Sequence, residues 1–237
     1  MKKINTLRGL LLATTLLIGA CGSDPLPVAP KVPAAQASQM PAPLPGSTDD
    51  PNARYMIQQT LQAVRGLPAY SLEMRWFQKK GEKSAEGVYD ITGQAPRSTK
   101  VVIREGKNQG TKIVFTGGKT ARVRASGLLS AVALDLAVDS DRLKSVRGYT
   151  LAETDMKATM DMLGDPRHQA RVLAKDATSV TMEVHGGPLL QGCVGMTAKI
   201  DPRTSLPMLI ELRDTKEVVY RLEMNNFKRL ARADLKI

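Results

Sequence analysis

The 237-residue sequence has few of the residues that most often perform chemistry or crosslink a fold. It contains two cysteines, two histidines and nine aromatic residues, namely one Trp, five Tyr and three Phe. Two cysteines are too few for a disulfide scaffold, and no apolar run reaches the roughly 18 to 20 residues of a membrane-spanning helix. Hydrophobic residues make up 42% and charged residues 24%, which argues against disorder throughout. A core with so few aromatics must consist of aliphatic side chains and methionine.

The first twenty residues have the pattern of an export signal. Lys2, Lys3 and Arg8 form a basic start, and a mostly apolar stretch of nine residues, 10–18, follows. This stretch is too short for a bilayer core of roughly 30 Å but fits the apolar segment of a signal peptide. Ile18-Gly19-Ala20-Cys21 resembles the bacterial lipobox, which implies cleavage after residue 20 and lipidation of Cys21, with palmitate among the acyl chains. The alternative is an ordinary secretion signal with an incidental cysteine.

Lipidation would hold the protein on a membrane of the cell envelope through Cys21. Two acyl chains already anchor a protein stably, at roughly 0.8 kcal/mol per buried CH₂. In diderm bacteria an aspartate directly after the cysteine retains lipoproteins at the inner membrane, and here that residue is Gly22. The resemblance therefore implies the outer membrane, on the side that faces the periplasm.

The net charge of +11 has to be read together with this signal. Loss of residues 1–20 removes three basic residues and no acidic one, which leaves 31 against 23 and a net charge of +8. These charges are dispersed rather than gathered in one stripe, and an exported protein meets phospholipid headgroups before it meets DNA. We therefore expect no nucleic-acid partner.

Residues 21–50 are predicted to be a lipidated cysteine followed by a Pro/Ala-rich tether. They contain seven of the 14 prolines. Such a segment cannot bury enough apolar surface to offset its ordering entropy, and its prolines favour extended polyproline II. The alternative is a Pro-rich ligand for a recognition domain. Residues 51–237 are predicted to form one folded domain.

Apolar residues in the folded part follow two periodicities, one typical of helices and one typical of strands. An amphipathic helix is expected over 52–65, after Asp49, Asp50 and Pro51, and a second helix begins at the capping box Thr150–Glu153 and ends at Gly164. Alternation of apolar and polar residues predicts strands near 70–77, 84–92, 98–105, 111–116, 119–125, 169–175, 178–185, 194–200, 208–212 and 218–224. Short connections favour antiparallel pairing. The fold class is α+β, a large meandering sheet with helices on one side.

Three segments resemble a known family. The alternating strand 70–76 (YSLEMRW) follows the first helix, and the late hairpin contains 201–211 (DPRTSLPMLIE) and 220–227 (YRLEMNNF). These resemble the LolA/LolB-like lipoprotein carriers, whereas 145–151 (SVRGYTL) is closer to a group of exported bacterial lipoproteins of unknown function. The resemblance implies a strongly curved antiparallel sheet, a half-barrel, covered on its concave face by helices. In the carriers the enclosed cavity holds acyl chains.

This chain also differs from the carriers at an early hairpin. They have basic residues just before the proline of an early hairpin, where this chain has Gly93-Gln94-Ala95-Pro96. A polar contact that gates the cavity is therefore expected to be missing. A carrier is also soluble, whereas its acceptor is membrane-anchored, as expected here.

Apolar residues of the first strand and the second helix are the candidate cavity lining: Leu72, Met74, Trp76, Met156, Met160 and Leu163. Flexible thioether side chains suit a variable apolar surface. The alternative is that these residues are ordinary core. The leading hypothesis is a membrane-anchored lipoprotein that binds an acyl chain or another apolar ligand, in lipid or lipoprotein handling. The second hypothesis is an envelope module that senses or binds an exported protein without a lipid ligand. The third is a hydrolase, which would need a carboxylate cluster that the sequence does not assemble.

No pattern indicates an enzyme, a cofactor or a metal site. His168 and His185 are expected on the surface or in strands, and Cys193 is expected to be a buried, inert thiol. No spacing of Cys and His matches a metal site. Asp155, Asp161 and Asp165 could pair as acid and base but are interpreted as a solvated helix face.

Overall fold

A computed structural model describes residues 49–127 and 131–237. The predicted signal, the lipidation site Cys21 and nearly all of the tether lie outside these residues. The described chain forms one 11-stranded sheet in the order β6-β5-β4-β3-β2-β1-β11-β10-β9-β8-β7. Its strands are β1 (Ala69–Lys80), β2 (Lys83–Gln94), β3 (Ser98–Glu105), β4 (Lys112–Phe115), β5 (Thr120–Arg124), β6 (Ala133–Ala137), β7 (Gln169–Lys175), β8 (Val180–His185), β9 (Gly195–Ile200), β10 (Pro207–Arg213) and β11 (Val218–Leu230).

Two meanders make up this sheet, and every pairing in it is antiparallel. Strands β1–β6 form the N-terminal half and β7–β11 the C-terminal half. The first and last strands join the two halves, with Met74 of β1 opposite Met224 of β11. Because the joining strands are the first and last of the folded part, neither half can complete its pairing alone.

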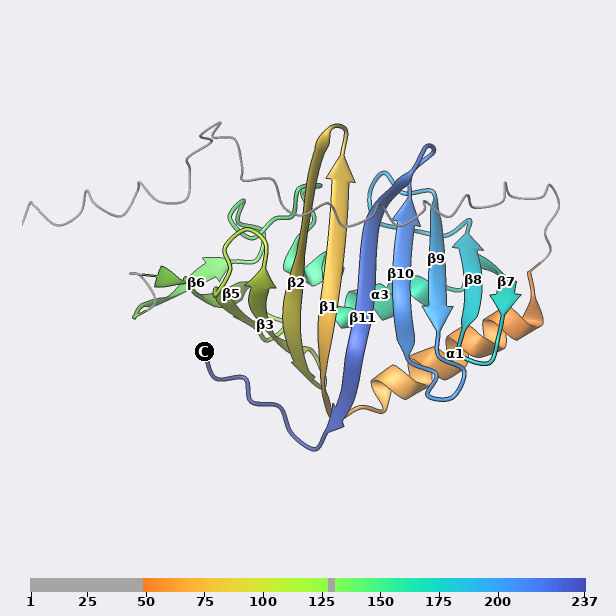
Figure 1. Ribbon diagram of the computed structural model, residues 1–237, viewed down its shortest axis with the longest axis horizontal. Coiled ribbons are helices and arrows are strands. Elements are labelled where there is room, and N and C mark those ends of the chain that lie inside the picture. The colour runs from red at the N-terminus through yellow and green to blue at the C-terminus, as the bar shows by residue number, and fades with distance from the viewer. Residues whose placement is uncertain (1–48, 128–130) are drawn as a thin grey trace, which may run out of the picture. The chain divides into compact units, whose positions relative to one another are not determined.

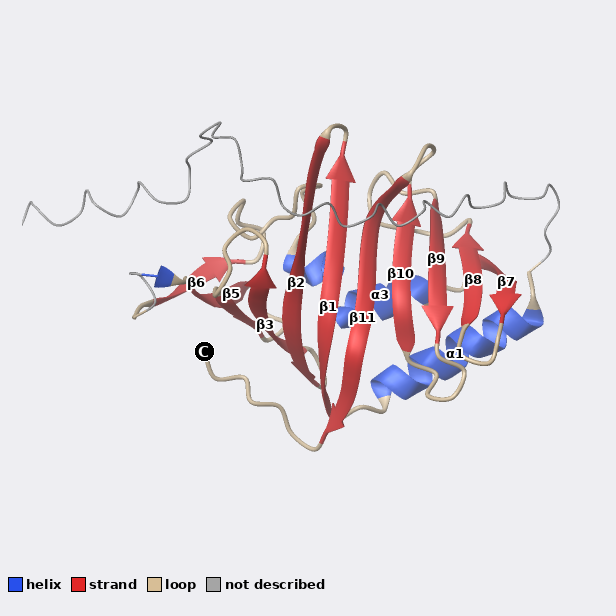
Figure 2. Cartoon of the chain, viewed as in Figure 1, coloured by secondary structure: helices blue, strands red, loops and turns tan. Residues whose placement is uncertain are grey.

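In the described residues, three helices lie on one face of the sheet: α1 (Pro51–Arg65), α2 (Leu151–Thr154) and α3 (Met156–Leu163). Figures 1 and 2 show α1 and α3 behind the sheet, mostly over its C-terminal half. We call the covered face the inner face; on β1 it carries Tyr70, Leu72 and Met74. The α+β class and the helix-covered, unclosed sheet predicted from the sequence are confirmed.

The start of α1 closes one edge of the sheet. The Asp50 carboxylate accepts the N–H of Asn52 at 2.8 Å and caps the helix. The Asp50 N–H donates to the Ala170 carbonyl at 2.8 Å, and the Asp49 carboxylate accepts the Ala170 N–H at 2.9 Å. These bonds lower the pKa of both aspartates, foremost the bond from Ala170 to Asp49 and that from Asn52 to Asp50. Edge strand β7 is thus paired by the residues that precede α1.

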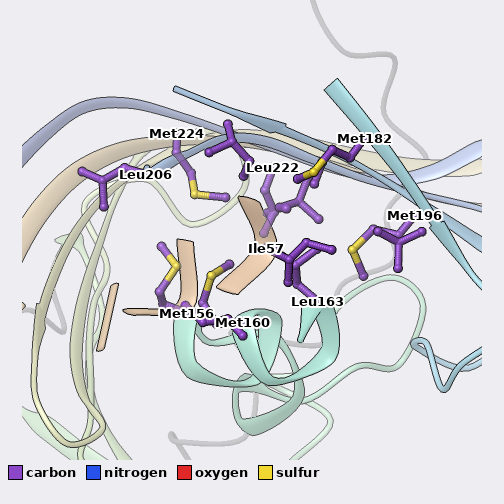
Figure 3. Close-up of a cluster of buried hydrophobic side chains, with 14 of the residues drawn as sticks. Ile57, Met156, Met160, Leu163, Met182, Met196, Leu206, Leu222 and Met224 are labelled. Atoms are coloured by element: carbon purple, nitrogen blue, oxygen red, sulfur yellow. The ribbon is translucent and has the colours of Figure 1, made fainter. Parts of the chain in front are cut away.

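Methionine supplies much of the core, as the scarcity of aromatics requires. Six methionines are buried: Met74, Met156, Met160, Met182, Met196 and Met224. They belong to one cluster with Ile57 and Leu61 of α1 and Leu163 of α3 (Figure 3). Most of the fully buried side chains of this cluster come from β8, β9 and β10. The packed core therefore lies mainly under the C-terminal half of the sheet.

The second predicted helix is in fact two helices. Asp155 has an extended backbone (φ −67°, ψ 165°), which ends α2 and begins α3. Its carboxylate accepts the Ala158 N–H at 2.7 Å, so Asp155 is the N-cap of α3. The interpretation of Asp155 as part of a solvated helix face is therefore wrong, because its side chain is only 5% exposed. Strand β6 was not predicted at all.

Candidate functional site

A cavity of about 390 Å³ lies between the end of α1, the β2–β3 turn and α3. This volume falls within the roughly 300–1,000 Å³ of typical small-molecule sites. Its walls are formed by Val64, Arg65, Leu67, Tyr70, Gln94, Ala95, Pro96, Arg97, Ser98, Thr99, Asp155, Met156, Lys157, Met160 and Asp161. The cavity is thus built where three elements meet beside the main core.

Tyr70 is a central part of the sheet side of this cavity. Its ring lies directly over Gly93 of β2, where an added Cβ would come 2.2 Å from the ring. Phe227 of β11 stacks on it with a centroid distance of 5.4 Å. Burial raises the pKa of the Tyr70 hydroxyl, which stays neutral at physiological pH. Together with Leu67 and Val64 at the end of α1, Tyr70 gives this wall a neutral, apolar surface.

The helix side is formed by Met156 and Met160 of α3. They are one turn apart, so both lie on the same face of the helix. Figure 3 shows both side chains pointing from α3 toward strand β11, which carries Leu222 and Met224. Unbranched thioether chains repack at small cost, so this wall can adapt to an apolar ligand of variable length.

Charged groups surround the apolar walls. Lys157 donates a hydrogen bond to Asp161, and Arg65 lies 3.7 Å from the same carboxylate. Arg97 Nε donates to Asp155 at 2.7 Å, and Arg97 Nη2 donates to the Ala152 carbonyl at 2.6 Å. An apolar interior with a charged rim matches an amphiphile better than a fully polar or fully apolar ligand.

The contacts of Arg97 add a polar contact that the sequence did not indicate. The expectation concerned a contact that gates the cavity and rested on the lack of a basic residue before Pro96. The chain instead places Arg97 directly after this proline, where it bonds to both α2 and the N-cap of α3. The hairpin and the helices are therefore tied together by a basic residue on the other side of the proline.

We expect Arg97→Met to lower the free energy of unfolding by about 1–3 kcal/mol, because the mutation leaves the buried Asp155 carboxylate without its cation. Urea denaturation would measure the loss. Arg167→Met is the matched control, because Arg167 pairs with Asp165 at 2.8 Å but is largely exposed. Such exposed pairs contribute about 0–1 kcal/mol. Equal losses in the two variants would contradict the role given to Arg97.

The structure distributes the six predicted cavity residues over two environments. Met156 and Met160 line the cavity. Leu72, Met74 and Leu163 are buried within the core cluster, and Trp76 is half-buried against Tyr89 with a ring distance of 5.3 Å. None of these four residues lines the cavity described above.

Sequence reasoning did not single out Tyr70, Leu67 or Thr99 as lining. Tyr70 lies in the same alternating row of β1 as Leu72 and Met74. Alternation predicts that this row faces inward, but it does not predict where along the row the cavity lies. Thr99 lies on β3 opposite Gly93, next to a turn whose path the sequence does not define. A glycine opposite a large aromatic in a predicted strand pair is the signal that could have marked this end.

The two histidines lie in different environments. His168 is fully buried before β7, contrary to the expected surface or strand position, and its Nδ1 accepts the Gly187 N–H at 3.0 Å. His185 lies on β8, as expected. No group of three His, Cys, Asp or Glu residues in the described part of the chain could hold a metal ion.

Cys193 is half-buried, with its Sγ 3.7 Å from the Tyr149 hydroxyl. Burial raises the pKa of the Cys193 thiol, so we expect slow alkylation by iodoacetamide at pH 7. The rate should rise as the pH passes the raised pKa. Native labelling as fast as labelling in denaturant would contradict this expectation.

The raised pKa of Cys193 also links this thiol to stability. The contribution of the thiol to the free energy of unfolding is fully present below the pKa of the unfolded state, about 8.5, and is lost as the pH rises through the higher pKa of the folded state.

Comparison with known proteins gives only distant matches. No family profile and no curated protein matches the sequence. Among solved structures, lipoprotein LppX from Mycobacterium tuberculosis is 13% identical, with 79% of this chain and 100% of that chain covered and a TM-score of 0.49. A putative outer membrane lipoprotein-sorting protein domain from Vibrio parahaemolyticus is 8% identical, with coverage of 77% and 94% and a TM-score of 0.43.

A LolA superfamily protein from Nitrosomonas europaea is 9% identical, with coverage of 77% and 95% and a TM-score of 0.37. These structures include the family that the sequence resembles, and at such scores no function is carried over from them. No helix in residues 49–127 or 131–237 is long and apolar enough to cross a membrane.

Proposed function

We propose that this protein is a lipid-anchored component of the bacterial envelope that binds the acyl chain of an amphiphile between α3 and the sheet. One observation carries the proposal: a cavity of about 390 Å³ whose walls are mainly apolar and whose rim is charged. Neutral Tyr70, Leu67 and the two methionines of α3 would contact the chain. The charged side chains of the rim would stay near the polar headgroup.

The proposed anchor is Cys21, lipidated after removal of residues 1–20, and the proposed location is the outer membrane, facing the periplasm. The Pro-rich segment would act as a tether between this anchor and the domain of residues 51–237. At about 3.1 Å per residue, its 29 residues could reach roughly 90 Å at most. The protein would bind and shelter a ligand rather than convert it.

The test uses residues 21–237 carrying Cys21→Ser, purified without detergent. Organic extraction followed by mass spectrometry is expected to recover a stoichiometric lipid. Titration of the delipidated protein with a dansyl-labelled fatty acid is expected to show saturable binding. One stoichiometric protein partner captured by crosslinking in intact cells, together with no lipid and no binding of the probe, would instead support an interaction module.

Thr99→Phe tests the place of binding. Thr99 lines the cavity, and a phenyl ring at this position would occupy space that the ligand needs. We expect the affinity for the dansyl fatty acid to fall at least about tenfold, equivalent to about 1.4 kcal/mol.

Thr92→Phe is the matched control, because Thr92 is a half-buried threonine of the adjacent strand β2 that is not part of the cavity wall. It pairs with Lys100, one residue along β3 from Thr99, and so faces the opposite side of the sheet. Unchanged binding in Thr99→Phe, or equal weakening in both variants, would place the ligand elsewhere.

A further inference from the structure

The outer face of the N-terminal half carries basic side chains without acidic partners. Lys112 of β4 and Arg124 of β5 are opposite each other in register, and Arg122 lies two residues from Arg124 on the same strand. Strand alternation therefore places all three on one face, opposite to the inward-facing Ile113 and Phe115. We call Lys112, Arg122 and Arg124 the outer basic patch.

Arginines elsewhere on the outer face are paired. Arg171 and Arg213 both bind Glu183, Arg221 binds Glu211, and Arg75 and Arg104 both lie beside Glu73. Within the described residues, none of the three members of the outer basic patch has a carboxylate oxygen within 4.0 Å. Asp135 of β6 lies opposite Arg122 in register but makes no ion pair with it. No ion pair among the described residues therefore neutralises the positive charge of the patch.

Exposed apolar side chains lie at the same edge of the sheet as this patch but not on its face. Strand β6 is the edge of the sheet and pairs only with β5. Leu134 on β6 is 50% exposed, and Val132 just before it is 56% exposed. Leu134 pairs with Val123, which pairs with the inward-facing Ile113, so Leu134 projects from the inner face. Figure 1 shows β5 and β6 at the end of the sheet opposite to β7, away from α1. The edge next to α1 is covered by chain, whereas the β6 edge has the exposed Leu134 on its inner face and the cations on its outer face.

We propose that the β5–β6 end of the sheet docks onto an anionic phospholipid bilayer. Edge strand β6 would enter the headgroup region edge-on. The outer basic patch would then bind lipid phosphates on one side of the sheet, while Val132 and Leu134 would reach the boundary between headgroups and acyl chains. Cations and exposed aliphatic side chains at one edge are the combination that such interfacial binding requires, and long arginine side chains can reach the phosphates from a strand next to the edge. This inference goes beyond the proposed ligand site, which lies at another part of the sheet.

Charge complementarity favours a bilayer over a protein strand as the occupant of this end. Strand pairing would require only the backbone of β6 and gives no role to three unpaired cations. Each basic residue near an anionic leaflet contributes attraction that is strongest within a Debye length, about 8 Å at physiological salt. The proposed tether would keep the domain within reach of such a surface and raise the effective concentration of the contact.

Vesicle cosedimentation tests the proposal with residues 21–237 carrying Cys21→Ser, which has no lipid anchor. We expect binding to vesicles of phosphatidylcholine and phosphatidylglycerol at low salt, weak binding to phosphatidylcholine alone, and loss of binding at about 0.5 M salt. The triple variant Lys112→Gln, Arg122→Gln, Arg124→Gln should bind the anionic vesicles about 100-fold more weakly. Leu134→Ser should weaken binding without changing its salt dependence.

The control triple variant Lys175→Gln, Lys199→Gln, Lys216→Gln removes the same charge from unpaired lysines of the C-terminal half. It should keep the affinity within a few-fold, and circular dichroism would confirm that every variant is folded. Equal losses in the two triple variants would overturn the proposal in favour of a net-charge effect. Absence of binding at low salt would also overturn it, as would a dimer that Leu134→Ser dissociates while vesicles stay unbound. The fatty-acid titration is done without vesicles, so the two proposals can fail separately.

Discussion

Glu183→Ala is expected to lower the free energy of unfolding by about 3 kcal/mol. The Glu183 side chain on β8 is 1% exposed and lies between two arginines of the outer face. Arg171 Nη2 lies 2.6 Å from Oε2, and Arg213 Nη2 lies 2.9 Å from Oε1. Removing the carboxylate leaves two guanidinium groups side by side without their shared anion, and both are partly shielded from water. Urea denaturation followed by circular dichroism would measure the change.

Glu211→Ala is the control for this effect. Glu211 makes a 2.6 Å ion pair with Arg221 on the same face, but it has one arginine partner rather than two, and that partner is one-third exposed. We expect a loss of about 1 kcal/mol, within the range for pairs that water can reach. If the two variants lost the same stability, the pair of arginines would not depend on Glu183 in the way described.

The second large effect is expected for Leu163→Ala, at about 2–5 kcal/mol, because the mutation removes three buried carbon atoms and leaves a cavity. Leu163 ends α3 and is 1% exposed within the core cluster. The neighbouring Gly164 lies so close to Leu61 of α1 that an added Cβ would come within 2.4 Å of it. This end of α3 therefore has little space in which to compensate for a lost side chain.

Thermal unfolding would detect this change, since each kcal/mol shifts the midpoint by about 2–4 °C in a domain of 150–250 residues. Met162→Ala is the control, because Met162 is on the same helix but only partly buried. Its loss should stay near 1 kcal/mol. A midpoint for Leu163→Ala no lower than that for Met162→Ala would mean that α3 is not held to the sheet through Leu163.

Local patterns determine much of this fold. The cap at Asp50 and the spacing of Ile57 and Leu61 define α1, and strict alternation defines β1 and its neighbours. These signals are local in sequence, so they can be read without knowing the partner strands. The interruption between α2 and α3 at Asp155 could not be predicted from local patterns, because Asp155 is also the partner of Arg97, 58 residues earlier. Strand β6 was missed because only one charged residue interrupts its small and aliphatic side chains.

The site was less predictable than the fold. Methionines 156 and 160 could be identified as neighbours on one helical face, but the wall opposite them depends on where the helix crosses the sheet. Leu72 and Met74 share the alternation of Tyr70, yet they lie under the packed part of the core. The pattern identifies the inner face of a strand, whereas the cavity depends on how far α3 extends along it.

The central claim is that an acyl chain binds between α3 and the first strands, and photocrosslinking tests it most directly. A fatty acid with a diazirine on its chain would be irradiated with residues 21–237 carrying Cys21→Ser, and the adducts would be mapped by mass spectrometry. We predict adducts on the peptides that contain Met156 and Met160 and on those that contain Tyr70 or Thr99, with loss of both in Thr99→Phe. Adducts confined to other surfaces, or no saturable labelling, would contradict the claim.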